Sequence, residues 1–350
     1  LKNMYNILGI SVGHNSSVAL ISDGELVYYL EEERLSKVKK DPHPFKVMIN
    51  LFSKYKIDEI VTVGTNHPPE HIKLVANGES PYYSLTRKFY PKVKFNKLNH
   101  QHHLTHAACA FYNSGFDKSS ILVIDGCGSL QKEDLLLEWE TNSIYEGNKN
   151  KGLKLKTQTY QNNLNKIGIG RVYEAITTFL GWDPTEGGKT MGLSSYGKPN
   201  NLFPPLFIGE WGNLDFFECN PYNSQVSISK KWQNIITEKE LYKDLAYHLQ
   251  QETLNKIKEI ISNLNTDTLC CVGGYFLNCV NNYKLIKEFP NIKFYFEPIS
   301  HDGGTSIGAA YVIGKELNFN LNKQSNIYLG TQYSKKELLK GIKKYVDTPL

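Results

Sequence analysis

Arginine is scarce in this sequence of 350 residues. Only three of its 40 basic residues are arginines (Arg34, Arg87 and Arg171), and the formal net charge is +5. Proteins that read a DNA sequence rely on arginine, whose planar guanidinium pairs with base edges, whereas lysine acts as a point charge. The composition therefore argues against a sequence-reading DNA-binding protein and leaves open a weak attraction to phosphate-bearing ligands.

Long apolar runs are also missing. No stretch approaches the roughly 18 apolar residues that a membrane helix needs, and the first residues lack the pattern of a signal peptide. The six cysteines form no Cys-x-x-Cys pair, which favours buried, reduced thiols over a metal cluster. With 40% hydrophobic and 21% charged residues, the chain has an ordinary globular composition. We expect a cytoplasmic protein with two domains, or one domain of two similar lobes.

Strand-like and helix-like segments alternate along the chain. Residues 7–29 predict three strands, separated by a polar Gly-His-Asn-Ser turn and by Asp23-Gly24, a strong hairpin signal. A similar strand, glycine turn and strand recur from residue 120 to residue 140. Helices are predicted at 45–55, 103–112, 168–180 and 238–264, with a further strand at 268–273. This order predicts an α/β fold with mixed sheets. Residues 148–156 and 318–326 are polar and predict a solvated loop and a linker, and a Ser-capped helix begins near Ser334.

The strongest chemical signal is the pair His102 and His106. Residues four apart share one face of a helix, so the two imidazoles can converge on one metal. Asp125 and Asp302 each lie in a glycine turn, and two histidines with two aspartates suit iron, zinc or manganese. The alternatives are a polar helix start for the histidines and a turn-forming or capping role for each aspartate.

Paired glycines recur in turns throughout the chain. Such turns let backbone amides approach a phosphate, and several in one α/β chain favour a nucleotide. The segment around Gly187-Gly188-Lys189 is not a P-loop, because Asp183 stands where the first glycine is needed and no strand leads into it. His14 lies in the first turn and is either a structural or a catalytic histidine. The recurring glycines are Gly126, Gly128, Gly187, Gly188, Gly273, Gly274, Gly303 and Gly304.

Taken together, these motifs resemble the O-carbamoyltransferases of the NodU/CmcH type, the group that includes the tobramycin carbamoyltransferase. The matching motifs occur in the same order as in the family, from residue 5 to about residue 315. It is carried by Gly13-His14-Asn15-Ser16-Ser17, Asp23-Gly24-Glu25-Leu26, Glu31-Glu32-Glu33-Arg34 with Lys39, His102-His103-Leu104-Thr105-His106, Asp125-Gly126, Gly187-Gly188-Lys189-Thr190-Met191-Gly192-Leu193, Gly273-Gly274 with Asn278, and Asp302-Gly303-Gly304-Thr305.

The resemblance implies an actin-like (ASKHA) two-lobed α/β fold related to the tRNA threonylcarbamoyl transferases. It implies a first lobe at 1–115, a second lobe with a nucleotide and metal cleft at 116–325, and a linker at 326–350 that leads to a YrdC-like domain absent from this chain. It also implies iron (Fe2+), or another divalent metal, on His102, His106, Asp125 and Asp302, with His14 as the catalytic base. The candidates to hold carbamoyl-adenylate are Lys39, Gly126, Gly128, Glu186, Gly187, Gly188, Lys189, Gly273, Gly274, Asn278, Gly304 and Thr305.

The implied reaction is ATP-dependent carbamoyl transfer. Carbamoyl phosphate and ATP would yield carbamoyl-adenylate in the YrdC-like domain or a partner subunit, and this chain would pass the carbamoyl group to an acceptor hydroxyl. The resemblance implies a sugar or natural product as the acceptor. The Lys-rich, Arg-poor composition with abundant Asn and Ile is typical of AT-rich genomes, many of them from phages, and adds a 5-hydroxymethyl-pyrimidine in nucleotide or DNA as a candidate, which would make DNA a partner. The alternatives are an enzyme like the tRNA threonylcarbamoyl transferases, a sugar kinase, and a non-catalytic nucleotide-binding subunit.

Overall fold

The computed structural model describes residues 4–64, 80–98, 100–132, 136–323, 326–327, 329 and 333–346. The predicted linker from residue 326 lies partly outside these residues. Among the helices that are described, none is both long enough and apolar enough to cross a membrane.

The first sheet is built from the N-terminal hairpins. Its strand order is β3-β2-β1-β4-β5, with β1, β2 and β3 antiparallel in turn and β4 and β5 parallel to β1. The expected hairpin at Asp23-Gly24 is confirmed, because both residues have positive φ, as the tight primed turns require. The strands are β1 (Asn6–Val12), β2 (Ser17–Ser22), β3 (Glu25–Glu31), β4 (Glu59–Gly64) and β5 (Lys94–Lys97).

The second sheet repeats the connectivity of the first. β6 pairs antiparallel with β8, β8 pairs antiparallel with β9, and β14 and β15 continue parallel to β6. The order β9-β8-β6-β14-β15 thus matches β3-β2-β1-β4-β5, with the short β7 added beside β8. This duplication confirms the actin-like, two-lobed α/β fold. The strands are β6 (Lys118–Ile124), β7 (Leu130–Lys132), β8 (Glu138–Asn148), β9 (Gly152–Asn162), β14 (Thr268–Val272) and β15 (Lys293–Phe296).

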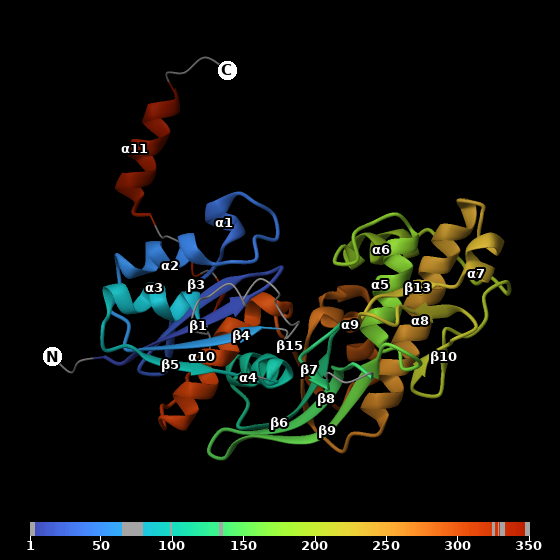
Figure 1. Ribbon diagram of the computed structural model, residues 1–350, viewed down its shortest axis with the longest axis horizontal. Coiled ribbons are helices and arrows are strands. Elements are labelled where there is room, and N and C mark those ends of the chain that lie inside the picture. Colours follow the sequence, from blue (N-terminus) through green and yellow to red (C-terminus); the bar gives the residue numbers. More distant parts are fainter. Residues whose placement is uncertain are drawn as a thin grey trace.

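Helices cover both sheets, and two small hairpins complete the second lobe (Figure 1). The hairpins pair β10 (Phe207–Ile208) with β11 (Trp211–Gly212), and β12 (Phe217–Cys219) with β13 (Val226–Ile228). The α-helices are α1 (Glu33–Ser36), α2 (Phe45–Phe52), α3 (Pro81–Phe89), α4 (His102–Ser114), α5 (Ile169–Phe179), α6 (Gly187–Ser194), α7 (Lys230–Ile235), α8 (Glu240–Ser262), α9 (Cys279–Glu288), α10 (Thr305–Glu316) and α11 (Lys335–Val346), with 3-10 turns at Gly274–Leu277 and Asp302–Gly304.

The predicted helices are confirmed as α2, α4, α5 and α8. Residues 148–156 form the turn of the β8–β9 hairpin and its flanks, and α11 begins after Ser334 as expected. Ser334 accepts a hydrogen bond from the Glu337 amide, and the Glu337 carboxylate accepts one from the Ser334 amide. This reciprocal pairing is the capping box that fixes the start of a helix.

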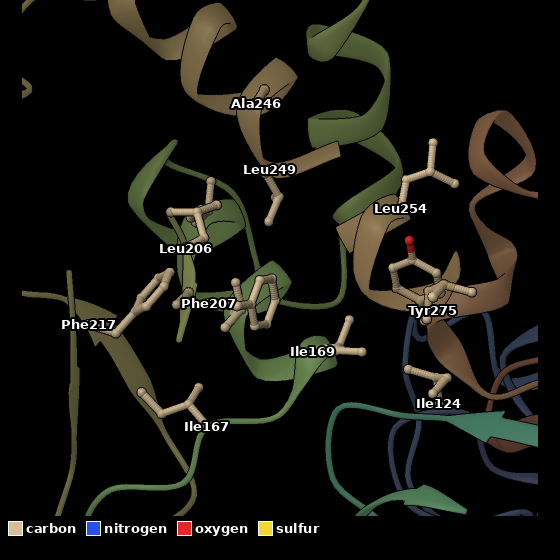
Figure 2. Close-up of a cluster of buried hydrophobic side chains, with 14 of the residues drawn as sticks. Ile124, Ile167, Ile169, Leu206, Phe207, Phe217, Ala246, Leu249, Leu254 and Tyr275 are labelled. Carbon is tan, nitrogen blue, oxygen red and sulfur yellow. The ribbon is translucent and has the colours of Figure 1, made fainter. Parts of the chain in front are cut away.

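Each lobe has its own apolar core. In the second lobe, α5 and α8 pack with Ile124 at the end of β6 and with the small hairpins, as Figure 2 shows. Tyr275 lies at the edge of this cluster, where the core meets the cleft described below. The rigid core thereby supports one wall of the candidate site.

Two helices of small residues, α4 and α10, join the lobes. They pack against each other, α10 also contacts β1, β2 and β4, and α4 contacts β6 and β14. A Cβ on Gly308 would lie 1.7 Å from the Thr105 carbonyl oxygen of α4, and one on Gly9 would lie 1.9 Å from the Ser306 carbonyl oxygen of α10. Only glycine allows these backbones to approach so closely. Although α10 comes late in the chain, it packs on the first sheet; the domain boundaries at residues 115 and 325 stay a prediction.

We predict that Gly9→Ala lowers the free energy of unfolding by about 1–3 kcal/mol, because the added methyl must push α10 away from β1. Urea denaturation measures the change. Gly192→Ala is the control: it lies in α6 with no atom within 4 Å of the added Cβ, so it should leave stability equal or slightly higher. Equal stabilities of Gly9→Ala and the parent would contradict the tight packing.

Candidate active site

A cleft of about 420 Å³ opens between the lobes where several strands end. Its floor contains the turn after β1, which carries His14, the turn after β6, which carries Asp125, and the turn before α10, which carries Asp302. The two lobes thus offer equivalent strand ends to one space, as the repeated topology requires. The predicted site residues that line it are His14, Lys39, Asp125, Gly126, Glu186, Gly187, Gly188, Gly274, Asn278 and Asp302.

The predicted metal ligands meet at the base of this cleft. The Nε2 atoms of His102 and His106 lie 3.0 Å apart. His102 Nε2 is 3.3 Å from Asp125 Oδ2, and both Nε2 atoms are 3.5 Å from Asp302 Oδ1. One ligand atom from each of the four residues lies within 4.8 Å of all the others. The structure therefore brings together the full set that the sequence predicts.

These four groups fit a bound metal ion. Ligands about 2.0–2.1 Å from a tetrahedral metal lie about 3.3 Å from one another, close to the separations seen here. Within the part of the chain that the structure describes, the Nδ1 atoms of His102 and His106 have no hydrogen-bond partner. A proton on each Nδ1 would leave both Nε2 lone pairs facing the same point, which only a shared cation or proton satisfies. Imidazole and carboxylate together suit a first-row transition metal.

The charges around the cluster favour a cation. Burial disfavours the charged form of His102, but Asp302 and Asp125 outweigh it and raise the pKa of His102 well above its ordinary value. Burial and mutual repulsion oppose ionisation of the two aspartates, yet the facing imidazoles hold the pKa of Asp125 and of Asp302 below the usual range. The two carboxylates therefore stay ionised and stabilise positive charge between them.

Backbone and side-chain contacts hold the ligands in place. The Gly274 amide donates to Asp125 Oδ1 at 3.3 Å, leaving Oδ2 for His102. Gly273 has φ of 100°, and a Cβ there would lie 2.3 Å from the Ile124 carbonyl oxygen. The glycine pair at 273–274 therefore orients a candidate metal ligand, and Gly274 also lines the cleft. At the start of α4, the His102 amide donates to Ser129 Oγ.

His14 lies beside the metal cluster and is open to the cleft. Its Nδ1 is 3.8 Å from Asp302 Oδ2, while Oδ1 of the same carboxylate faces His102 and His106. The side chain of His14 is 46% exposed, whereas the imidazoles of His102 and His106 are buried. A single carboxylate thus connects an accessible histidine to the buried cluster.

The predicted nucleotide residues divide into two groups. Gly187 and Gly188 begin α6 at the cleft wall, and a Cβ on Gly188 would meet no atom within 4 Å, so this backbone is open to a ligand. Glu186 lines the cleft and pairs with Lys189 at 2.9 Å and Lys39 at 3.6 Å. Asn278 also lines it, although its side chain caps α9 and bonds to Gln250.

Five members of the predicted set lie outside the cleft lining. Gly128 packs against His103 and Glu140, and Gly304 packs against the Ile299 carbonyl. The Thr305 hydroxyl donates to the Asp302 carbonyl at 2.6 Å and lies 2.9 Å from the Ser11 hydroxyl. Gly128 and Gly304 allow close packing, and Thr305 holds the turn that carries Asp302. These residues therefore contribute by positioning the site. The five residues are Gly128, Lys189, Gly273, Gly304 and Thr305.

Sequence reasoning missed several lining residues. Tyr173 and Tyr275 form an aromatic wall with ring centroids 6.3 Å apart, and Glu174 beside them is held by Arg171. His301 Nε2 lies 3.4 Å from Glu31 Oε1 at the opposite wall. Glu31 stands inside a motif of the resemblance and could have been singled out there. Tyr173 and Glu174 lie in an ordinary amphipathic helix, which gives no signal of a site.

We predict that His106→Ala weakens metal binding by more than about 100-fold, because even outer partners of a metal ligand are worth about 10–100-fold. Elemental analysis of purified protein, followed by titration with Fe2+ and Zn²⁺, measures the loss. His248→Ala is the control, since His248 bonds to the Pro204 carbonyl outside the cluster. Stoichiometric metal in His106→Ala would rule out the proposed ligand set.

We predict that His103 makes the metal-free protein less stable in acid. Burial lowers the pKa of His103 to about 4 from an ordinary 6.5. Between these values the unfolded chain binds a proton that the folded chain refuses, so stability rises with pH. Above pH 6.5 the titration of His103 takes nothing from the free energy of unfolding. As the pH falls to about 4, the free energy of unfolding drops by about 3 kcal/mol. In chelator-treated protein, His103→Gln should show a shallower fall in urea stability over this range; parallel curves would contradict the assignment.

Comparisons with known proteins identify the family of this chain. A sequence-family model described as Carbamoyltransferase N-terminus matches residues 50–311. The nodulation protein NolNO of Sinorhizobium fredii is 25% identical over 337 residues, covering 87% of this chain and 47% of its own length. An uncharacterized protein of Synechocystis sp. is 26% identical over 399 residues, covering 96% of this chain and 62% of its own length. The chain thus spans between about half and two thirds of these relatives.

Solved structures share the fold. HypF of T. kodakarensis superposes with a TM-score of 0.53 at 12% identity, covering 90% of this chain and 48% of HypF. The activator of the 2-hydroxyisocaproyl-CoA dehydratase from Clostridium difficile gives a TM-score of 0.50 at 11% identity, covering 92% of this chain and all of the activator, 100%. Because the family model covers most of the sequence, this chain belongs to the carbamoyltransferase N-terminus family.

Proposed function

We propose that this chain is the transferase part of an O-carbamoyltransferase, which moves the carbamoyl group of carbamoyl-adenylate to an acceptor hydroxyl. One observation carries the proposal: an accessible His14 stands 3.8 Å from a carboxylate of the buried two-histidine, two-aspartate cluster, in the same cleft as the open backbone of Gly188. A proton acceptor, a cation site and a phosphate-compatible turn therefore face one space. We also propose a cytoplasmic location, where ATP is available.

In this proposal His14 acts on the acceptor. It accepts the hydroxyl proton as the acceptor oxygen bonds to the carbamoyl carbon, and the bond from that carbon to the phosphate oxygen breaks, releasing AMP. General base catalysis of this kind typically contributes about 10²–10⁴-fold. Asp302 Oδ2, 3.8 Å from His14 Nδ1, stabilises the imidazolium that results. A metal on the four ligands, Fe2+ in this proposal, would polarise the carbamoyl carbonyl.

The adenylate has a matching wall on the opposite lobe. The amides that begin α6 at Gly187 and Gly188 are open to the cleft, and the rings of Tyr173 and Tyr275 offer an apolar face for a base. The activator from Clostridium difficile, which shares the fold, was solved with ADPNP bound. These features support a nucleotide between the lobes, with its phosphate toward His14 and Lys39.

Formation of the adenylate is a separate step in this proposal. The relatives extend well beyond the span that this chain matches, so a second domain or a partner subunit can combine carbamoyl phosphate with ATP. Pyrophosphate release from ATP with carbamoyl phosphate tests this division. We expect no release from this chain with Fe2+, and AMP release once synthetic carbamoyl-adenylate is supplied with an acceptor. Pyrophosphate release by the chain alone would contradict the division of labour.

The identity of the acceptor can be tested by comparing three classes of hydroxyl compound. Chitotriose, an aminoglycoside and 5-hydroxymethyl-dCMP represent the sugar, natural-product and pyrimidine hydroxyls, and mass spectrometry detects a carbamoylated product. DNA containing 5-hydroxymethyl-pyrimidines extends the test to a polymer, whose binding should weaken with salt if phosphates contribute.

We predict that His14→Asn lowers the rate of carbamoyl transfer by about 10²–10⁴-fold. AMP release from carbamoyl-adenylate, measured by chromatography, gives the rate, and calorimetric titration with AMP should give an unchanged affinity. His43→Asn is the matched control, because His43 bonds to Tyr82 outside the cleft lining. Transfer at the parental rate in His14→Asn would refute the assignment of the base.

A further inference from the structure

Two ion pairs connect the lobes across the mouth of the cleft. Lys40 Nζ lies 2.6 Å from Asp183 Oδ1, and Lys39 Nζ lies 3.6 Å from Glu186 Oε1. Lys39 and Lys40 belong to the loop between α1 and α2 in the first lobe, whereas Asp183 and Glu186 precede α6 in the second. The Lys40 side chain is only 28% exposed, so its ion pair is the better shielded of the two.

The loop that carries Lys40 also holds the turn of His14. The Gly13 amide donates to the Pro42 carbonyl at 3.2 Å, and the Ser16 hydroxyl donates to the Asp41 carbonyl. These two bonds lie on either side of His14 in the sequence. Gly13 has φ of 125°, and a Cβ there would meet no atom within 4 Å, so nothing packs against the turn at this position. The two bonds therefore tie this side of the turn to the residues that follow Lys40.

The loop itself adopts an unusual backbone. Lys37 and Lys40 both have φ of 61°, in the left-handed region that lysine rarely adopts. The Lys40 amide donates to Glu33 Oε2. Tertiary contacts must offset the cost of this conformation, and the bond from Lys40 to Asp183 is the shorter of the two that reach the other lobe.

Asp183 is fixed from its own side. Its Oδ1 accepts hydrogen bonds from the amide and the hydroxyl of Thr185. The Lys40 ammonium, through its hydrogen bond and its charge, and the Thr185 bonds together hold the pKa of Asp183 below its usual range. The Glu186 amide donates to the Asp183 carbonyl just before Gly187. The carboxylate that receives Lys40 is therefore part of the turn that presents the open α6 backbone.

We propose that Lys40 and Asp183 form a latch between the lobes that positions His14. The ion pair holds the loop of Lys40, and this loop holds the His14 turn through Pro42 and Asp41. The same contact holds the turn before Gly187, so the proton acceptor and the nucleotide wall are set together. Lys40 and Asp183 are positioning residues, and their catalytic consequence rests on the proposed carbamoyl transfer.

The variants are chosen to remove charge and little else. Asp183→Asn keeps an oxygen for the Thr185 bonds, and Lys40→Met keeps an unbranched chain of similar length. We expect each to lower kcat for AMP release from carbamoyl-adenylate at least about fivefold, with a smaller change in KM, because misplacement of a reacting group acts on the chemical step. The double variant should be no slower than either single one. Lys40→Arg, which keeps the positive charge, should retain most of the parental rate.

Hydrogen exchange reports on the latch without any activity. The Gly13 amide, bonded to Pro42, should exchange about tenfold faster in Asp183→Asn and Lys40→Met than in the parent. Asp215→Asn is the matched control: Asp215 pairs with Lys231 at 2.7 Å, with both side chains exposed, and should change neither exchange at Gly13 nor kcat. Metal content should be equal in all variants, since neither residue belongs to the ligand cluster.

The outcomes separate the latch from the proposed function. Faster exchange at Gly13 together with lower kcat supports it. Unchanged exchange overturns it, and so does faster exchange with parental kcat, because the ion pair would then not position His14. Two additive single effects would overturn the pairing of Lys40 with Asp183. If the parent protein transfers no carbamoyl group, the proposed function fails, and the exchange rates alone decide whether the latch holds the His14 turn.

Discussion

Two imidazoles and two carboxylates buried at one point impose the main constraint on this structure. Each group would lose hydration on burial, and only charges of opposite sign, or a metal ion, compensate that loss. His102 and His106 come from α4, Asp125 from the end of β6, and Asp302 from the turn before α10. The cluster therefore requires both sheets and the two central helices to be in place at once.

Small residues make this convergence possible. The backbones of β1, α4 and α10 approach so closely at Gly9 and Gly308 that any side chain would collide with a carbonyl oxygen. A looser contact would move Asp302 away from the histidines, and the glycines at 273 and 274 similarly bring an amide to Asp125. The glycine turns thus contribute twice, by presenting open backbone to the cleft and by allowing the candidate metal ligands to meet.

The duplicated topology accounts for a site between two lobes. Each sheet ends at the cleft in an equivalent turn, so His14 in one half corresponds to Asp125 in the other. The proposed transfer from an adenylate to an acceptor in this cleft would need both halves in register. At the base, the Ser17 hydroxyl contacts Gly303 and Ser306 and ties the first sheet to α10 and to the turn of Asp302, whereas Lys40 and Asp183 connect the lobes at the mouth.

Local patterns in the sequence were sufficient to predict many of the elements of this protein and its family. The Asp23-Gly24 hairpin, the amphipathic helices, the spacing of His102 and His106 and the ordered motifs of the carbamoyltransferases are properties of neighbouring residues, and each predicted its element, its ligand pair or the family. Sequence did not distinguish Gly188, which is open to the cleft, from Gly304, which packs against a carbonyl, because the difference lies in what surrounds each backbone. Nor did it indicate Tyr173, Glu174 or the pairing of Lys40 with Asp183, 143 residues away. Such contacts join segments with no periodic relation, so only the tertiary structure decided them.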